Sequence, residues 1–453
     1  MGSYKLKNQL KLWTFSVNIL KRLIIQICHR LINTIKGSKF YDRRLIRKII
    51  KVRELQNIRI EELKNSYKVK VGFMMVSSST WKYDAVYQKF EKAGRYKPKV
   101  VIIPLITKGR EYCEDELKLS ESLCVKNGYN YVLPMDKNGK WTDIKISLKP
   151  DLVFFSNPNA LSLPIYHIEN FKDCLTIYLP YSIRVDNLSE YSYNSKFSSL
   201  VWRNYYETKL HFEIAKHYSR IKAENVKVSG HPVIDTFRNQ NLSVESQWKS
   251  SKIRKKKIIW APHWTIPGFQ ATNLDWGAFL FYADFMLEIA QKYVSEIQLA
   301  FKPHPFLENL LKKEELWGIE KTSEYYKNWE ELSNGQLEKG EYIQLFIDSD
   351  ALIHDSGSFS VEYLELNMPI LYTKSRYNVE ESFNDLGKEA IQSHYIANEK
   401  KDIEDFIKNV VISGEDPIKE NRVNFRNKHL NPDGKSSSDF IFKDIEQMLS
   451  KKE

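Results

Sequence analysis

Two successive series of short apolar segments, separated by polar stretches of helical length, constrain the fold of this chain more than any other feature. The first series occupies residues 69–76, 100–105, 131–133, 152–155, 175–179 and 226–229, and the second occupies residues 258–261, 297–301, 351–353 and 370–372. The segments are rich in Val, Ile, Phe and Tyr, which is typical of strands that are buried on both faces. Their alternation with helix-like stretches such as 82–93 and 114–127 predicts parallel sheets covered by helices.

The length of 453 residues predicts two domains, because a single hydrophobic core stops growing at roughly 250–300 residues. A highly charged stretch at 238–257 lacks a strong apolar pattern and separates the two series of strands. We therefore expect an α/β fold of two Rossmann-like, doubly wound domains. The predicted boundaries are a basic amphipathic helical arm at 1–66, a first Rossmann-like domain at 67–240, a linker at 241–257, a second Rossmann-like domain at 258–430, and a C-terminal helix at 431–453.

The excess positive charge is concentrated in the N-terminal arm. Residues 1–60 contain fifteen Lys or Arg and only two acids, Asp42 and Glu54, whereas the remainder contains 54 basic and 55 acidic side chains. A balanced body gives no indication of nucleic-acid binding, so we predict no nucleic-acid partner. The chain also lacks a run of about 18 uncharged apolar residues, so no membrane-spanning helix is predicted.

The arm itself has the periodicity of an amphipathic helix, and Gly37-Ser38 predicts a break between two helices. Such a basic helix fits the anionic cytoplasmic face of a membrane, which predicts a peripheral membrane protein. The alternative is a helix that packs on the protein's own body or on a second subunit. The apolar positions are Trp13, Val17, Leu20, Ile24, Ile27, Leu31 and Ile35.

Several common kinds of site are absent from the sequence. It has no P-loop, no HExxH, no GxSxG elbow and no GxGxxG after the first apolar segment, which argues against the enzymes that those motifs define. Asp348-Ser349-Asp350 resembles a metal-binding DxD, but its position on a polar turn before a strand favours a capping role. We predict no metal and no cofactor.

The four cysteines are scattered and form no CxxC pair, which favours a reducing cytosol over a disulfide framework. They are Cys28, Cys113, Cys124 and Cys174.

Polar side chains follow three consecutive apolar segments of the second series, at the point where each strand is expected to end. The carboxyl ends of parallel strands meet at one edge of a sheet, where ligands bind. A loop with two serines and a glycine at the start of a helix offers N–H groups, hydroxyl groups and the positive end of a helix dipole, all of which suit phosphate. The polar residues are His263, Lys302, His304, Asp355, Ser356, Gly357 and Ser358.

We predict that Lys302, His304 and the loop Asp355-Ser356-Gly357-Ser358 bind the pyrophosphate of a nucleotide-linked donor. Glu362, one turn into the next helix, is predicted to accept hydrogen bonds from the ribose. The alternative is that Asp355 is an ordinary helix N-cap and Glu362 a capping or solvated residue. His231, at the end of the first series, is either a catalytic group or only part of a turn that directs the chain into the linker.

These motifs, taken in order, are similar to those of the CDP-glycerol glycerophosphotransferase family of teichoic-acid and capsule synthesis. The likeness covers roughly residues 225–440. The segments that carry it are Gly230-His231-Pro232 with Asp235, Ala261-Pro262 with Trp264, Lys302-Pro303-His304-Pro305, the run 349–358 with Glu362, Pro369-Ile370, and Asp433-Gly434-Lys435-Ser436-Ser437.

The resemblance implies a GT-B fold whose first domain binds the acceptor and whose second domain binds the nucleotide-linked donor. It implies that glycerol phosphate or ribitol phosphate is transferred from a CDP-polyol to a lipid-linked or polysaccharide acceptor at the membrane face. It also implies that His304, Ser356, Ser358 and the Asp355 loop bind the donor pyrophosphate. One alternative is a GT-B glycosyltransferase that uses a nucleotide sugar; nucleotide-sugar epimerases share this architecture. The other alternative is an inactive membrane-bound scaffold.

One departure from the family concerns the catalytic base. Family members carry a Trp-His-Gly-Thr segment whose histidine is proposed to activate the acceptor hydroxyl, whereas the matching segment here is Tyr178-Leu179-Pro180-Tyr181-Ser182. Either another group serves as base, or the substrates differ from those of glycerophosphate transfer. We predict His263, His304 and His231 as catalytic residues of an in-line transfer, in which a histidine activates the attacking hydroxyl.

Overall fold

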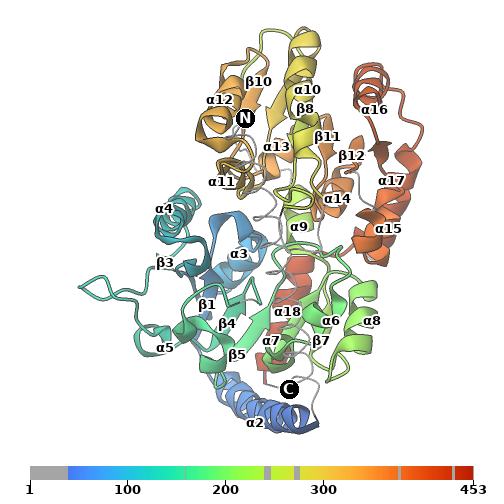
Figure 1. Ribbon diagram of the computed structural model, residues 1–453. Coiled ribbons are helices and arrows are strands. Elements are labelled where there is room, and N and C mark those ends of the chain that lie inside the picture. The colour runs from blue at the N-terminus through green and yellow to red at the C-terminus, as the bar shows by residue number, and fades with distance from the viewer. Residues whose placement is uncertain are drawn as a thin grey trace, which may run out of the picture. The chain divides into compact units, whose positions relative to one another are not determined.

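The computed structural model describes residues 39–158, 160–238, 246–269, 276–375, 379–430 and 434–451 (Figure 1). The chain divides into two compact units, Met1–Leu55 and Gln56–Glu453, and both sheets belong to the second. The predicted amphipathic helix of the arm and its Gly37-Ser38 break lie outside the described residues, and helix α2 (Lys39–Lys64) follows them. Within the described ranges, no helix combines the length and the apolar character needed to cross a membrane.

The first sheet contains seven parallel strands in the order β3-β2-β1-β4-β5-β6-β7. The order reverses between β1 and β4, which is the topological switch point where open α/β sheets bind ligands. The strands are β1 (Val69–Met75), β2 (Tyr96–Ile102), β3 (Tyr131–Val132), β4 (Leu152–Phe155), β5 (Leu175–Tyr178), β6 (Arg203–Tyr206) and β7 (Val226–Val228).

The second sheet contains six parallel strands in the order β10-β9-β8-β11-β12-β13, with its switch point between β8 and β11. Ala261 at the end of β8 pairs with His354 at the end of β11, so the loops after these strands start side by side. Two parallel, helix-covered sheets confirm the predicted fold class. The strands are β8 (Lys256–Ala261), β9 (Ile297–Phe301), β10 (Gly335–Leu337), β11 (Ala351–His354), β12 (Ile370–Thr373) and β13 (Tyr395–Ala397).

The apolar pattern of the sequence did not predict three of the strands, namely β6, β10 and β13. Strand β6 carries Arg203 and Asn204 within four residues, and β10 and β13 have three residues each. Strands this short or this polar have no periodic pattern of their own in the sequence, so whether they form depends on pairing with a neighbouring strand.

Helices cover both sheets (Figure 1). In the first half they are α3 (Asp84–Lys92), α4 (Arg110–Lys126), α5 (Ile144–Ser147), α6 (Ser189–Tyr193), α7 (Lys196–Leu200), α8 (Lys209–Tyr218) and α9 (Pro232–Arg238). In the second half they are α10 (Phe279–Lys292), α11 (Leu307–Leu311), α12 (Gly318–Glu331), α13 (Ile343–Ile347), α14 (Phe359–Glu362), α15 (Asp385–Ile391), α16 (Lys400–Asp405) and α17 (Lys419–Phe425), followed by the C-terminal α18 (Ser437–Leu449).

Aromatic side chains fill the centre of each core. In the first, Phe73 of β1 stacks on Phe154 of β4 with ring centroids 4.4 Å apart. In the second, Phe301 of β9 stacks between Trp260 of β8 and Trp329 of α12, at 5.0 and 5.2 Å. These rings bury a large apolar area against the middle strands, so they fix the positions of the strand ends.

Helix α18 returns from the second half of the chain and packs beside α3 and α9 (Figure 1). Its Ile441, Ile445 and Leu449 are buried in the core of the first sheet. The carboxylate of Asp235, on α9, accepts hydrogen bonds from the backbone N–H groups of Ser437 at 3.0 Å and of Ser438 at 2.7 Å, which are free at the start of a helix. The two ends of the family-like region therefore meet in space, while Asp433 of the predicted motif lies outside the described residues.

Replacing Asp235 by Ala is expected to lower the free energy of unfolding by about 2–3 kcal/mol, because it removes a charged cap that also accepts from the hydroxyl groups of Ser436 and Ser438. Urea denaturation measures the change. Asp385→Asn, on an exposed side chain, is the control and should stay within about 0.5 kcal/mol of wild type. Equal stability of the two variants would contradict the capping role.

Candidate functional site

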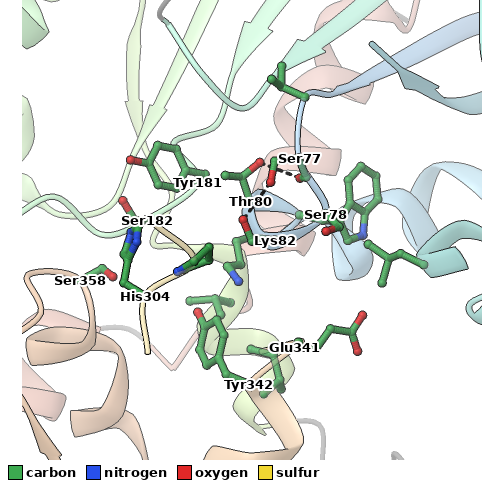
Figure 2. A pocket seen from close by; sticks show the side chains of 18 of the residues that line it. Ser77, Ser78, Thr80, Lys82, Tyr181, Ser182, His304, Glu341, Tyr342 and Ser358 are labelled. Atoms are coloured by element: carbon green, nitrogen blue, oxygen red, sulfur yellow. Dashed lines mark hydrogen bonds between the residues drawn. The ribbon is translucent and has the colours of Figure 1, made fainter. Parts of the chain in front are cut away.

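A cavity of about 510 Å³ lies at the carboxyl ends of β1, β8, β9 and β11, with walls from both sheets (Figure 2). The structure brings six of the predicted site residues into its lining, and Asp355, Gly357 and His231 are not among the lining residues. The six are His263, Lys302, His304, Ser356, Ser358 and Glu362.

The two histidines of the second sheet stand next to each other, with ring centroids 5.3 Å apart. Burial lowers the pKa of His263 to about 3. Burial also lowers the pKa of His304 well below its ordinary value, and the nearby His263 and Lys302 lower it further. Both imidazoles are therefore neutral at pH 7.

A backbone contact selects the tautomer of each of these rings. The N–H of Phe306 donates to Nδ1 of His304 at 3.1 Å, and the N–H of Thr265 donates to Nδ1 of His263 at 3.3 Å. A nitrogen that accepts a hydrogen bond carries no proton, so Nε2 holds the proton of the neutral ring. Each histidine is therefore a hydrogen-bond donor at Nε2 rather than a ready proton acceptor.

Lys302 supplies a cation at the end of β9. Its Nζ donates to the carbonyl oxygen of Gly340 at 2.7 Å, which holds the side chain along the cavity wall. Burial lowers the pKa of Lys302 to about 8, the charge of Lys82 lowers it further, and Glu338 opposes the shift. A partly desolvated ammonium beside two neutral N–H donors is a set of groups that suits a pyrophosphate.

Asp355 lies behind this wall instead of on it. Its carboxylate is buried and accepts from the backbone N–H groups of His263 and of Ala278, the latter at 2.6 Å. Burial raises the pKa of Asp355 to about 7, and the two backbone hydrogen bonds oppose that shift. The residue predicted to bind the donor directly thus holds two loops of the second domain in place.

Ser356 and Ser358 face the cavity while Gly357 faces the protein interior. The backbone N–H of Ser356 donates to Nδ1 of His354 at 3.1 Å, which fixes the first turn of the loop. A Cβ atom on Gly357 would lie 2.4 Å from the ring of Trp276 and 3.2 Å from Val185. Only glycine lets the loop approach this ring, so Gly357 sets the position of the two serines.

The wall formed by the first sheet was not anticipated from the sequence. It comes from the turn after β1, where Ser77, Ser78, Thr80 and Lys82 line the cavity (Figure 2). The N–H and hydroxyl of Ser78 donate to Glu116 of α4 at 2.6 and 2.7 Å, which anchors this turn. A run of hydroxyl residues followed by a lysine, directly after the first predicted strand, was the available signal.

Glu362 is placed differently from the predicted ribose contact. Tyr342 donates to its carboxylate, the backbone N–H of Ile183 donates to it as well, and the ammonium of Lys82 contributes a favourable charge. Burial raises the pKa of Glu362 to about 7 against these three effects. Its carboxylate therefore joins the two domains at the edge of the cavity.

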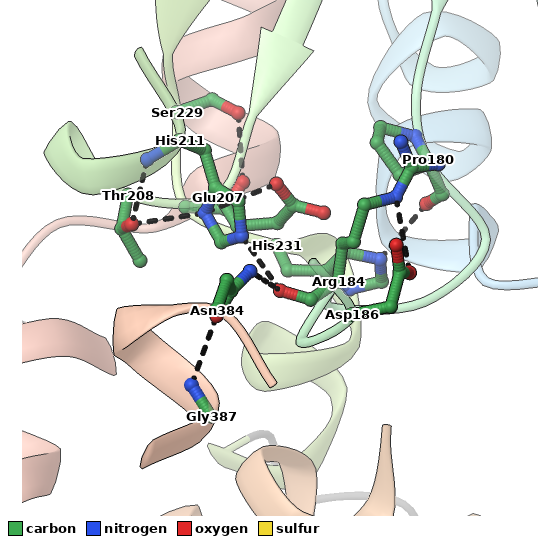
Figure 3. A network of polar contacts seen from close by, with 11 residues as sticks. Pro180, Arg184, Asp186, Glu207, Thr208, His211, Ser229, His231, Asn384 and Gly387 are labelled. Atoms are coloured by element: carbon green, nitrogen blue, oxygen red, sulfur yellow. Dashed lines mark hydrogen bonds and ion pairs between the residues drawn. The ribbon is translucent and has the colours of Figure 1, made fainter. Parts of the chain in front are cut away.

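His231 belongs to a network beside the cavity (Figure 3). Its Nε2 donates to the carbonyl oxygen of Pro180 at 2.9 Å, and its Nδ1 accepts from the N–H of Val233 at 3.2 Å. Burial lowers the pKa of His231 to about 4. With both nitrogens bonded to backbone, the ring holds the segment before Tyr181 and Ser182, and its predicted catalytic role stays a prediction without geometric support.

The same network joins the chain just after Tyr181 and Ser182 to the second domain. The carbonyl oxygen of Arg184 accepts from Nε2 of His211 at 2.8 Å and from the amide of Asn384 at 3.0 Å (Figure 3). Asn384 also caps α15 through the N–H of Gly387 at 2.9 Å. Tyr181 and Ser182, just before Arg184, line the cavity.

Asp348 and Asp350, considered above as a possible metal motif, bind protein groups. Asp348 accepts from the side chains of Ser246 and Gln344, and Asp350 accepts from the backbone N–H of Lys257 at 2.8 Å. In the parts of the chain that the structure describes, no group of three or more His, Cys, Asp or Glu side chains is placed to hold a metal ion.

The cavity wall formed by the second sheet lies within a region that matches a known family. The model of the CDP-Glycerol:Poly(glycerophosphate) glycerophosphotransferase family matches residues 197–447. This chain belongs to that family. It is therefore a transferase enzyme of the glycerophosphotransferase class, as the resemblance implied. A comparison with curated proteins finds no relative.

Solved structures share the GT-B fold at low sequence identity. The wall teichoic acid polymerase TagF, in a crystal soaked with CDPG, is 15% identical with a TM-score of 0.56, over 92% of this chain and 100% of that one. MnaA from S. aureus, in a co-structure with UDP, is 15% identical with a TM-score of 0.51, over 84% and 97%. A putative UDP-N-acetylglucosamine 2-epimerase from Listeria monocytogenes is 12% identical with a TM-score of 0.53, over 84% and 96%.

Replacing Gly357 by Ala is expected to destabilise the protein by about 1–3 kcal/mol, because the added methyl group meets the ring of Trp276. The displaced serines should also weaken the binding of CDP. Urea denaturation and the thermal shift produced by CDP measure the two effects. Gly340→Ala, where nothing lies within 4 Å of the added atom, is the stability control, and a Gly357→Ala protein as stable as this control would refute the packing argument.

Proposed function

We propose that this enzyme transfers glycerol phosphate or ribitol phosphate from a CDP-linked donor to a hydroxyl group of a lipid-linked or polysaccharide acceptor. The second domain binds the donor and the first domain binds the acceptor. The observation that carries the proposal is the wall on which His263, Lys302, His304, Ser356 and Ser358 meet at three neighbouring strand ends. A wall that offers N–H, hydroxyl and ammonium donors is suited to the charged oxygens of a pyrophosphate.

The tautomers define the chemistry that we propose for the histidines. His304 and His263 are neutral and donate from Nε2, so they bind oxygens of the donor and stabilise the charge that develops on the leaving nucleotide. Such a transfer depends on positioning and electrostatics more than on covalent help from the protein. A single hydrogen bond from Nε2 of His304 would then serve both its predicted binding role and its predicted catalytic role.

A panel of nucleotide-linked donors tests the function. We expect the purified full chain to show a thermal shift with CDP-glycerol or CDP-ribitol and to release CMP from one of them in the presence of an acceptor. UDP- and CMP-sugars are expected to produce neither effect. Transfer from a nucleotide sugar would instead establish a glycosyltransferase, and donor binding without any turnover would point to a scaffold.

Two variants of His304 in the same assay separate donation from proton transfer. His304→Ala should lower kcat by about 10²-fold or more, because it removes a donor to developing charge. His304→Gln carries an amide N–H near the position of Nε2 and should keep at least a tenth of the activity. An inactive His304→Gln protein that still folds and binds CDP would instead assign the histidine to proton transfer.

We also propose that the basic arm binds an anionic membrane surface. The excess of basic residues over acids in residues 1–60 supports this, because each Lys or Arg near such a surface contributes about 1 kcal/mol. A peripheral enzyme held in this way would meet a lipid-linked acceptor without crossing the membrane.

Vesicle sedimentation tests the arm. The full chain is expected to sediment with vesicles that contain phosphatidylglycerol at low salt, and the bound fraction should fall at high salt because salt screens the charges. Vesicles of phosphatidylcholine alone serve as the control. No sedimentation with the anionic vesicles would exclude the membrane role.

A further inference from the structure

Lys82 is one of the cations that the first domain places in the cavity, opposite the donor wall. It follows the turn after β1, and Figure 2 shows it extending from the side of Thr80 toward Tyr342, with His304 and Ser358 across the cavity. The Nζ of Lys82 lies 4.1 Å from the centre of the Tyr342 ring.

Two of the other lysines of the cavity wall are held by oxygen atoms. Lys126 pairs with Glu341 at 3.2 Å and Lys302 donates to a backbone oxygen, whereas Lys108 lies over the ring of Phe306 at 3.9 Å, much as Lys82 lies over that of Tyr342. Among the described residues, no acceptor takes a hydrogen bond from the Nζ of Lys82. Three N–H groups on an otherwise partly buried side chain therefore remain for a ligand.

We propose that Lys82 is a catalytic residue whose ammonium contacts the phosphoryl group that is transferred. In this step the acceptor oxygen forms a bond to phosphorus, and the bond from that phosphorus to the bridging oxygen of the pyrophosphate breaks. The electron pair stays on the phosphate of CMP, and the proton of the acceptor hydroxyl is released to the solvent. Negative charge spreads over the oxygens of the phosphoryl group during transfer, and a cation from the opposite domain stabilises it.

Neighbouring charges keep Lys82 protonated up to mildly alkaline pH. Removal from water lowers the pKa of Lys82 to about 8, while Glu362 on α14 and Glu341 before α13 oppose that shift. Lys302 after β9 is the nearby positive charge on the donor wall, and His231 is neutral at pH 7. The charged form binds the phosphoryl group, so the rate should fall as the pH rises through about 8.

The test measures kcat/KM for transfer by the full chain between pH 6 and 10. Lys82→Met should lower kcat/KM by about 100-fold at pH 7, and wild type should lose activity above pH 8. Lys82→Arg should keep a measurable part of the activity, because arginine stays charged. Lys92→Met, at the exposed end of α3, is the control and should match wild type.

This inference rests on the proposed function, so a second measurement tests Lys82 without depending on transfer activity. Calorimetry with inorganic pyrophosphate should show at least fivefold weaker binding to the Lys82→Met protein than to wild type. A chain that binds pyrophosphate in this Lys82-dependent way but transfers no polyol phosphate would refute the proposed function alone. Lys82→Met activity within threefold of wild type, or pyrophosphate binding that is absent or unchanged, would overturn the role of Lys82.

Discussion

The buried carboxylate of Asp355 holds together the cavity wall formed by the second sheet. It lies at the end of β11 and accepts the N–H groups of His263, after β8, and of Ala278, before α10. A buried carboxylate is costly unless its oxygens receive hydrogen bonds, and here backbone donors supply them. The loop after β8 is thereby fixed to the loop after β11, and the cavity between them keeps its shape.

The histidines at the strand ends share one geometry. His231, His263, His304 and His354 each accept, at Nδ1, the backbone N–H of the residue two positions later. This contact requires only a tight turn directly after a strand, so the same local arrangement recurs in both domains. It leaves the proton of the neutral ring on Nε2 in every case. His263 and His304 on the cavity wall can therefore donate hydrogen bonds from Nε2.

The two domains are also tied together by chain segments that cross between them. Helix α18 packs on the first sheet although it follows the second, and Asp235 caps its start. The carbonyl oxygen of Arg184 binds Asn384 of the second domain, and Glu362 receives contacts from both. Residues of the first domain such as Lys82 can then take fixed positions relative to the cavity wall formed by the second sheet.

The sequence by itself determined the two parallel sheets and the strand ends at which His263, Lys302, His304 and Ser356 stand. Buried strands and their flanking turns are local patterns, and parallel pairing brings their carboxyl ends to one edge. Only the tertiary structure decided that Ser356 faces the cavity while Asp355 faces the interior, and that Lys82 stands across from them. The sequence of a turn does not show which of its side chains faces a cavity and which faces the interior. Long-range contacts with residues such as Ala278 and Tyr342 determine which side chain remains free to bind.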